Sequence, residues 1–219
     1  MIKSSLKDRK LVYEVDPKVA LITGSTSGCG QKLALYLSKI GLKLVITGRD
    51  EDRIKSVAQQ CRQLSNTTVL EVKADLLDDN QVRQLLDTTI DQMGRLDILI
   101  HCAQISLPLS ITDTDVMQKF DTVFRLNVRS AVLLTSMALP YIQAISGGII
   151  TLTSDSGFRP YDQEFAFCIT ESAVNYFTKC LALETKGKGV SVLTLNSDLV
   201  NRKDFDLNPW LSTTLVSRL

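Results

Sequence analysis

The sequence predicts an α/β fold, a doubly wound parallel sheet of about six strands with helices on both faces. Short apolar runs rich in β-branched residues alternate along the chain with longer segments of helical period. Such mostly apolar strands are typical of a parallel sheet that is covered by helices on both sides. Right-handed crossovers between successive strands then give the doubly wound arrangement.

Each expected element rests on its own run of residues. The strands are expected at residues 19–23, 42–47, 67–73, 96–101, 148–153 and 190–195. The helices are expected at residues 30–40, 51–64, 79–93, 115–145 and 164–184. Because no repeat or linker divides this series, we expect one domain over residues 18–200. Residues 1–17 would form an extension, and residues 201–219 a tail or a partial substrate lid.

Composition excludes several classes of protein. The net charge of +1 argues against nucleic acid or an acidic membrane as an obligate partner. No apolar run is long enough to span a bilayer, and the start of the chain lacks the apolar core of a secretory signal. Five cysteines without CxxC spacing indicate reduced thiols in an intracellular protein, in the cytoplasm first of all. With His101 as the single histidine, no metal site is expected.

A glycine-rich turn, TGSTSGCG, follows the first expected strand and opens the first helix. This is the setting in which a Rossmann-type fold binds the phosphates of a dinucleotide, at the positive end of the helix dipole. Glycines at these positions allow a tight turn, close approach of the pyrophosphate and close packing of helix on strand. The expected cofactor contacts in the turn are Gly24, Ser25, Ser27, Gly28 and Gly30. A glycine turn without a ligand is the alternative.

The end of the second strand bears on which nucleotide suits the site. Gly48 stands about where an acid would bind the ribose 2′-hydroxyl of NAD. Arg49 could instead pair with a 2′-phosphate, which favours NADP over NAD. The alternative is that Arg49 is a solvated charge and Asp50 the N-cap of the next helix. Asp75, after the third strand, could accept a hydrogen bond from the adenine amino group or act only as an N-cap or loop residue.

Several ordered motifs resemble the short-chain dehydrogenase/reductase family over residues 18–200. TGSTSGCG fits the family's TGxxxGxG turn, and FRLNV at 124–128 fits its helix with a catalytic Asn. GIITLTS at 148–154 fits the strand with the catalytic Ser, and residues 158–184 follow the active-site helix. The resemblance implies hydride transfer between a nicotinamide and a small carbonyl or alcohol ligand.

Carried over by position, the resemblance makes Asn127 the family's Asn and Ser154 its Ser. The Tyr that gives or takes a proton is replaced by Phe167, and the Lys that lowers its pKa by Glu171. A ring without a hydroxyl moves no proton, and an anion would raise the pKa of a nearby phenol. We therefore expect impaired or absent catalysis. Glu171 could still accept hydrogen bonds from ribose hydroxyls, or be a plain helix residue.

Other positions also depart from the family pattern. The family's Asn-Asn-Ala-Gly after the fourth strand is His101-Cys102-Ala103-Gln104, where Ala103 remains an expected cofactor contact. His101 could be considered as a substitute acid, although a structural role at a strand end is the plainer interpretation. The family's Pro-Gly after the sixth strand is Ser197-Asp198, which adds negative charge near the nicotinamide position.

The C-terminal segment is short for this family, since the chain ends soon after the sixth strand. Four apolar residues in it could cover the cleft or a partner, or lie in a partly disordered tail: Phe205, Leu207, Trp210 and Leu211.

Three functions stay open from the sequence. The first is an NADP(H)-binding protein, inactive or severely impaired, that acts as a cofactor sensor or as the silent subunit of an oligomer. The second is an active NADP(H)-dependent oxidoreductase that uses water, Ser154 or His101 as its proton source. The third is a nucleotide-free scaffold. Relatives pair through the helices that correspond to residues 115–145 and 164–184, so a homo- or hetero-oligomer of related subunits is expected.

Overall fold

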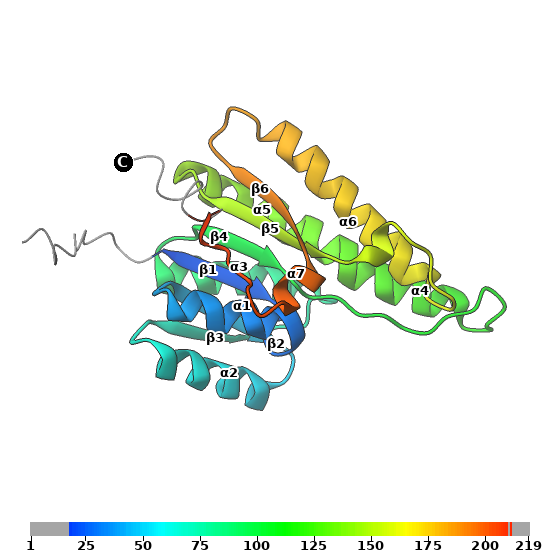
Figure 1. Ribbon diagram of the computed structural model, residues 1–219, viewed down its shortest axis with the longest axis horizontal. Helices are drawn as coiled ribbons and strands as arrows, with labels where there is room; N and C mark the ends of the chain where they lie inside the picture. Colours follow the sequence, from blue (N-terminus) through cyan, green and yellow to red (C-terminus); the bar gives the residue numbers. More distant parts are fainter. Residues whose placement is uncertain (1–17, 210, 212–219) are drawn as a thin grey trace, which may run out of the picture.

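The computed structural model describes residues 18–209 and residue 211, and it has a six-stranded parallel sheet at its centre (Figure 1). The strands are β1 (Val19–Thr23), β2 (Lys43–Gly48), β3 (Val69–Lys73), β4 (Ile98–His101), β5 (Gly148–Thr153) and β6 (Ser191–Asn196). Their order is β3-β2-β1-β4-β5-β6, so the direction of winding reverses between β1 and β4. Ligands of open α/β sheets bind at such a switch point.

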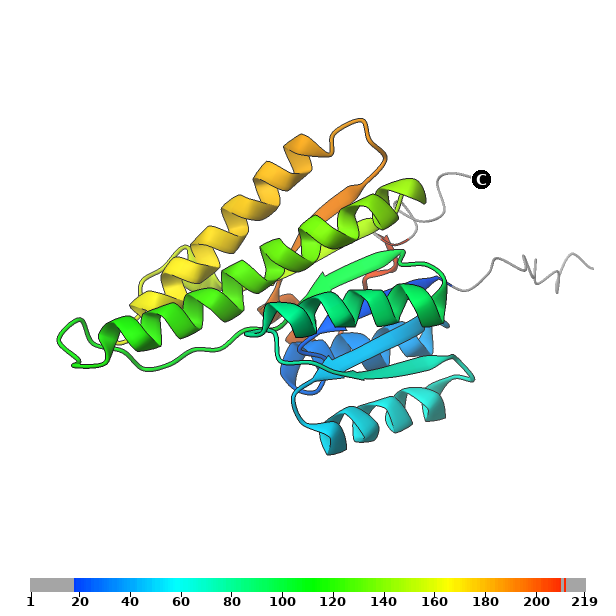
Figure 2. The same ribbon diagram turned by 180° about the vertical axis from the view of Figure 1, so that it is seen from behind.

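Helices cover both faces of the sheet, as the sequence predicts (Figures 1 and 2). One face carries α1 (Gly28–Lys39) and α2 (Glu51–Leu64). The other carries α3 (Asp79–Met93), α5 (Ser130–Ala144) and α6 (Phe165–Glu184). A π-helical turn at Arg125–Arg129 joins α4 (Val116–Phe124) to α5, and the three form one continuous rod in Figure 2. Short helices at Asp155–Gly157 and α7 (Ser197–Asn201) follow β5 and β6.

Local signals explain where the elements begin and end. All five residues of β1 and all six of β5 are buried, which accounts for their continuous apolar sequences. The Asp50 carboxylate accepts hydrogen bonds from the main-chain N–H groups of Asp52 and Arg53, so the expected N-cap of α2 is confirmed. Gly94 ends α3 in the left-handed conformation, with φ +74°.

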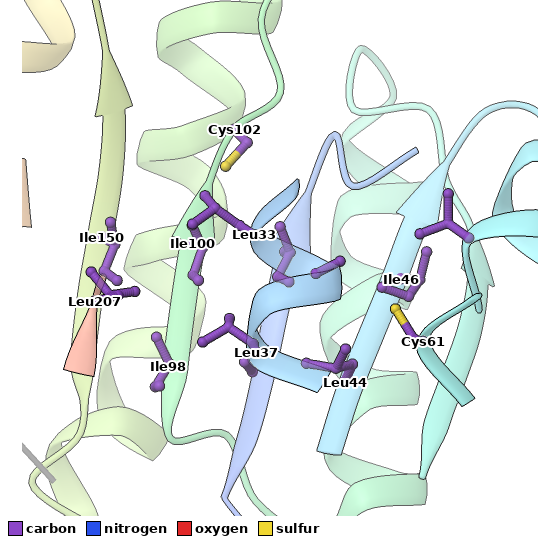
Figure 3. Packing of buried hydrophobic residues seen from close by; sticks show 14 of the residues in the cluster. Leu33, Leu37, Leu44, Ile46, Cys61, Ile98, Ile100, Cys102, Ile150 and Leu207 are labelled. Carbon is purple, nitrogen blue, oxygen red and sulfur yellow. The ribbon is translucent and has the colours of Figure 1, made fainter. Parts of the chain in front are cut away.

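The segment after β6 folds back over the α1 face of the sheet. Leu207 is buried beside Ile150 of β5 (Figure 3), and Leu211 is buried in the same cluster. The Tyr36 hydroxyl of α1 donates a 2.6 Å hydrogen bond to Asp206. The same hydroxyl accepts a 3.1 Å bond from the main-chain N–H of Leu207. This part of the expected tail therefore packs as core, and Trp210 lies outside the described residues.

Two further expectations concern thiols and membranes. All five cysteines carry free thiols, and burial raises the pKa of Cys61 to about 11. Among the described residues, no helix has the length and apolar character needed to cross a membrane.

Candidate functional site

A cavity of about 350 Å³ opens at the carboxyl edge of the sheet, beside the switch point between β1 and β4. Its walls come from the turn after β1, the end of β2 and the segments after β3 and β4. They include Gly24, Thr26, Ser27, Gly28, Gly48, Arg49, Arg53, Asp75, Ala103 and Gln104. Seven of the eight predicted cofactor residues, including Gly30, therefore line this cavity.

Each glycine of the turn has a separate physical reason. Gly24 has φ +63°, and a Cβ there would lie 2.8 Å from the Cα of Ala103. A Cβ on Gly30 would overlap the carbonyl oxygen of Gly24. Gly28 has φ +52° and no heavy atom within 4 Å of a Cβ built on it, so its surroundings are open. The protein therefore leaves no room for a side chain at Gly24 or Gly30, whereas Gly28 faces open space.

The two serines of the turn have different positions. Ser27 is exposed on the cavity wall at the N-cap of α1, and its side chain makes no capping hydrogen bond. The first-turn N–H groups of α1 therefore have no side-chain cap at this position. Ser25 is buried, and its hydroxyl donates to the Thr47 carbonyl at 3.2 Å and accepts from the Thr47 N–H at 2.8 Å. Ser25 ties the turn to β2 and does not line the cavity.

Arg49 is exposed on the cavity wall and makes no hydrogen bond or ion pair with the part of the chain that the structure describes. Arg53, one helical turn later, lines the same cavity and pairs with Asp50 at 3.4 Å. A Cβ on Gly48 would lie 2.8 Å from the Thr26 side chain, so an acid at that position would displace Thr26. Sequence reasoning missed Arg53, because Arg49 precedes the N-cap of α2 and helical spacing gives no signal that both side chains line one cavity.

Asp75 lies on the cavity wall, in the turn between β3 and α3. One of its carboxylate oxygens accepts a 3.0 Å hydrogen bond from the Leu77 N–H, and its own N–H donates to the Gln81 side chain at 2.9 Å. Asp78, three residues on, is the N-cap of α3. The turn holds Asp75 in place at the edge of the cavity, where a ligand could reach it.

Asn127 is buried in the π-helical turn between α4 and α5. Its side chain accepts from the Ile105 N–H at 2.8 Å and donates to the Ile105 carbonyl at 2.9 Å. It also donates to the Thr170 hydroxyl at 3.0 Å. Asn127 therefore fixes the segment after β4 against α6, and π-helical turns of this kind are frequent at functional sites.

Ser154, which follows β5, meets Glu171 of α6. Glu171 is 1% exposed, and its carboxylate accepts a 2.6 Å hydrogen bond from the main-chain N–H of Ser154. Burial raises the pKa of the Glu171 carboxyl, and hydrogen bonds from Ser154 oppose that rise. Phe167 is half-buried one helical turn earlier, and its carbonyl accepts from the Thr170 hydroxyl at 2.8 Å. Phe167 offers no side-chain hydroxyl for proton transfer.

His101 lies at the end of β4, where its ring Nε2 and the Thr135 hydroxyl are 2.8 Å apart. Burial lowers the pKa of His101 to about 4, so the ring is neutral near pH 7. A neutral imidazole that is held by a buried hydroxyl is a poor proton donor. The geometry agrees with a structural role.

After β6, Ser197 and Asp198 form the start of α7. The Asn196 side chain accepts from the Asp198 N–H at 2.8 Å and donates to Asp155 at 3.0 Å. The Cys29 thiol of α1 lies 3.7 Å from the Ser197 carbonyl oxygen. The strand end is thereby attached both to the end of β5 and to the first turn of α1.

The residues present fit the adenosine and pyrophosphate half of a dinucleotide. Gly28 leaves open space at the uncapped end of α1, and Arg49 offers an exposed cation at the end of β2. The Thr47 hydroxyl, buried at the cavity wall, has no hydrogen-bond partner among the described residues. The sequence resemblance predicts that the nicotinamide half would lie beside Phe167 and Glu171.

Comparison with known proteins agrees with this geometry. Residues 18–204 match the family model described as short chain dehydrogenase. An uncharacterized oxidoreductase of Staphylococcus epidermidis is 34% identical over 189 residues, which are 86% of this chain and 80% of the relative. One of Staphylococcus saprophyticus is 30% identical over 87% of this chain and 81% of the relative.

Solved structures show the same fold. L-Sorbose reductase from Gluconobacter frateurii, in complex with NADPH and L-sorbose, is 27% identical with a TM-score of 0.78, over 90% of this chain and 80% of that one. A 7α-hydroxysteroid dehydrogenase in complex with NADH is 22% identical with a TM-score of 0.76, over 82% and 69%, a likeness of fold alone. The chain belongs to the short-chain dehydrogenase/reductase family, an oxidoreductase family whose fold binds nicotinamide nucleotides.

Proposed function

We propose that this protein binds NADP(H) in the cavity at the switch point, and that it lacks the hydride-transfer activity usual for its family. It would act as a cofactor-binding protein or as the silent subunit of an oligomer. The observation that carries the proposal is the Glu171 carboxylate, which is buried and hydrogen-bonded to Ser154 in the place of the family's Lys. With Phe167 one turn away, the Tyr–Lys proton donor pair is replaced as a unit.

The loss of chemistry follows from the two substitutions together. A positioned acid or base is worth about 10²–10⁴ in rate. Phe167 cannot supply one, His101 is neutral and engaged with Thr135, and Asn127 uses its side chain to hold Ile105. Ser154 keeps its hydroxyl, which accepts a 3.3 Å hydrogen bond from the Ser156 N–H, but a serine hydroxyl is a weak acid. Substrate would therefore find no efficient proton source.

The choice of NADP over NAD rests on the end of β2. Arg49 is exposed and uncommitted on the cavity wall, and its forked donors suit a 2′-phosphate. An acid at Gly48, which NAD would require, is obstructed by Thr26. The relative L-sorbose reductase was solved with NADPH, which is in keeping with this preference.

An oligomer is supported by the outer face of α6. Ile169, Tyr176 and Leu183 are 45%, 69% and 73% exposed and follow one another at intervals of seven residues. That spacing places them on one side of the helix, as a stripe of exposed apolar side chains. A second copy of this chain, or a related subunit, would bury the stripe.

Calorimetric titration with NADPH and NADH tests the proposal, together with hydride-transfer assays on a panel of carbonyl substrates. We expect micromolar binding that favours NADPH and turnover at or near the uncatalysed background. Turnover at rates normal for the family would overturn the inactive half of the proposal. Failure of well-folded protein to bind either nucleotide would overturn all of it and favour a scaffold.

A further inference from the structure

The cavity at the switch point stops short of the residues that define the family's chemistry. On the β5 side its wall reaches Leu152, two residues before Ser154. None of the four family positions lines it: Asn127, Ser154, Phe167 and Glu171. The cavity therefore has walls for an adenosine and its phosphates, while the positions that would surround a nicotinamide lie beyond it.

The cavity found beside two of those positions, Asn127 and Glu171, is small. A second cavity, lined by His101, Asn127, Thr151 and Glu171 among others, has a volume of about 10 Å³. That volume admits about one water molecule and is far too small for a nicotinamide ring. The buried Thr151 hydroxyl has no hydrogen-bond partner among the described residues, which suits a water there. Since Glu171 is fixed on the Ser154 N–H, its carboxylate faces inward at the position where the family's Lys would bind ribose.

At the opposite end, the cavity at the switch point presents recognition groups for one specific substituent. Arg49 is exposed and has no partner within the described part of the chain, whereas Arg53 is paired with Asp50. Asp75 is positioned by its own turn near the adenine position. A 2′-phosphate would meet an available guanidinium, and a bare 2′-hydroxyl would meet no acid at Gly48.

We propose that this chain binds its nucleotide through the 2′-phosphoadenosine half alone and is indifferent to the nicotinamide. The ligand class is adenosine nucleotides that carry a 2′-phosphate and a 5′-diphosphate, with or without a nicotinamide ring. This inference rests on the proposed function, because it uses the same cavity. Its consequence is that the protein responds to the total amount of 2′-phosphorylated nucleotide and not to its redox state.

The test is a set of calorimetric titrations with NADPH, NADP⁺, 2′-phospho-ADP-ribose and ADP-ribose. We expect the first three to bind within about threefold of one another, which is less than 1 kcal/mol. ADP-ribose, which lacks the 2′-phosphate, should bind at least about tenfold more weakly, because a charge-assisted pair with Arg49 is lost. Arg49→Ala should remove that difference. Arg83→Ala, an exposed arginine on α3 away from the cavity, is the matched control and should leave all four affinities unchanged.

The outcomes separate the two proposals. If NADPH binds but 2′-phospho-ADP-ribose binds more than about tenfold more weakly, the nicotinamide is engaged and this inference fails, while the proposed function stands. Equal binding of ADP-ribose and 2′-phospho-ADP-ribose also overturns it. If none of the four binds to well-folded protein, the proposed function itself has failed.

Discussion

The Glu171 carboxylate and the Ser154 main chain share a 2.6 Å hydrogen bond that joins α6 to the end of β5. Because Glu171 is 1% exposed, its carboxylate is removed from water and faces the protein interior. Glu171 thereby makes a structural connection between a strand and a helix.

This connection predicts a pH-dependent stability that Glu171→Gln should remove. Burial raises the folded-state pKa of Glu171 above its ordinary value of 4.5. A raised pKa means that the folded state binds the proton more tightly than the unfolded state. The contribution of Glu171 to the free energy of unfolding is therefore full below pH 4.5. It is lost as pH rises through the folded-state pKa. Chemical denaturation of both proteins from pH 4 to pH 8 measures the difference.

The glutamine variant keeps an acceptor for the Ser154 N–H without a titrating group. The stability of the wild type relative to Glu171→Gln should therefore fall as pH rises over this range. Glu171→Ala should cost about 1–3 kcal/mol at low pH, since the Ser154 N–H loses its acceptor. A constant difference between wild type and Glu171→Gln would contradict the buried, titrating carboxyl.

Phe167→Tyr alone should not restore catalysis. A phenol at that position would stand near the Glu171 carboxyl, so no cation would lower the pKa of the phenol and favour phenolate. We expect carbonyl reduction with NADPH to increase by less than about tenfold, against the 10²–10⁴ that a positioned acid contributes. The double variant Phe167→Tyr with Glu171→Lys is the comparison, measured in the same assay. If Phe167→Tyr alone reduced carbonyls at a rate typical of the family, the charge at Glu171 would be unimportant for catalysis.

Local patterns in the sequence were sufficient to predict most of the fold. All six strands and five helical segments occur near their expected residues, because continuous apolar runs mark buried parallel strands and caps such as Asp50 mark helix starts. The sequence predicts one helix over the segment 115–145, whereas the structure has a π-helical turn at Arg125–Arg129 within it. Periodicity is judged over windows of about 11–18 residues, so it does not resolve a deviation in backbone hydrogen bonding that is confined to five residues.

What sequence reasoning could not predict depends on long-range contacts. The residues of the glycine turn give no sign that the Ser25 hydroxyl would be used by Thr47, which is 22 residues away. The packing of the tail on α1 likewise depends on Tyr36 and Asp206, which are 170 residues apart. The inward direction of Glu171 is a third example, because it requires the Ser154 N–H as a partner.

The glycine turn predicts different effects for two neighbouring substitutions. Gly28→Ala should cost about 1–2 kcal/mol for its positive φ and should also weaken NADPH binding, because the added methyl enters open space at the cavity. Gly30→Ala should cost about 3 kcal/mol or more, because the methyl would overlap the Gly24 carbonyl. Gly94→Ala is the matched control, with φ +74°, free space and a location away from the cavity. Gly94→Ala should lower stability and leave NADPH binding intact. If Gly28→Ala bound NADPH as tightly as the wild type, that result would argue against a phosphate at this turn.

Tyr36→Phe should loosen the segment after α7. Its hydroxyl is both the donor to Asp206 and the acceptor for the Leu207 N–H, so one atom holds two points of the tail. We expect the melting temperature to fall by about 2–4 °C. Hydrogen exchange at Leu207 should become faster. Tyr141→Phe is the control, because that exposed hydroxyl makes no hydrogen bond with the described residues, and an equal effect of both variants would contradict a specific role for Tyr36.

The stripe on α6 predicts self-association that charge can abolish. Three exposed apolar residues at heptad spacing form a surface that water solvates poorly, and burial of each such side chain contributes about 1.5–3 kcal/mol. Tyr176→Asp with Leu183→Asp should therefore convert an oligomer into a monomer in sedimentation velocity, because two carboxylates would be buried without partners. Leu64→Asp, 50% exposed at the end of α2 on the opposite face of the sheet, is the matched control and should leave the oligomer unchanged. A wild-type protein that sediments as a monomer at all concentrations would rule out the α6 interface, while a monomer produced equally by Leu64→Asp would place it elsewhere.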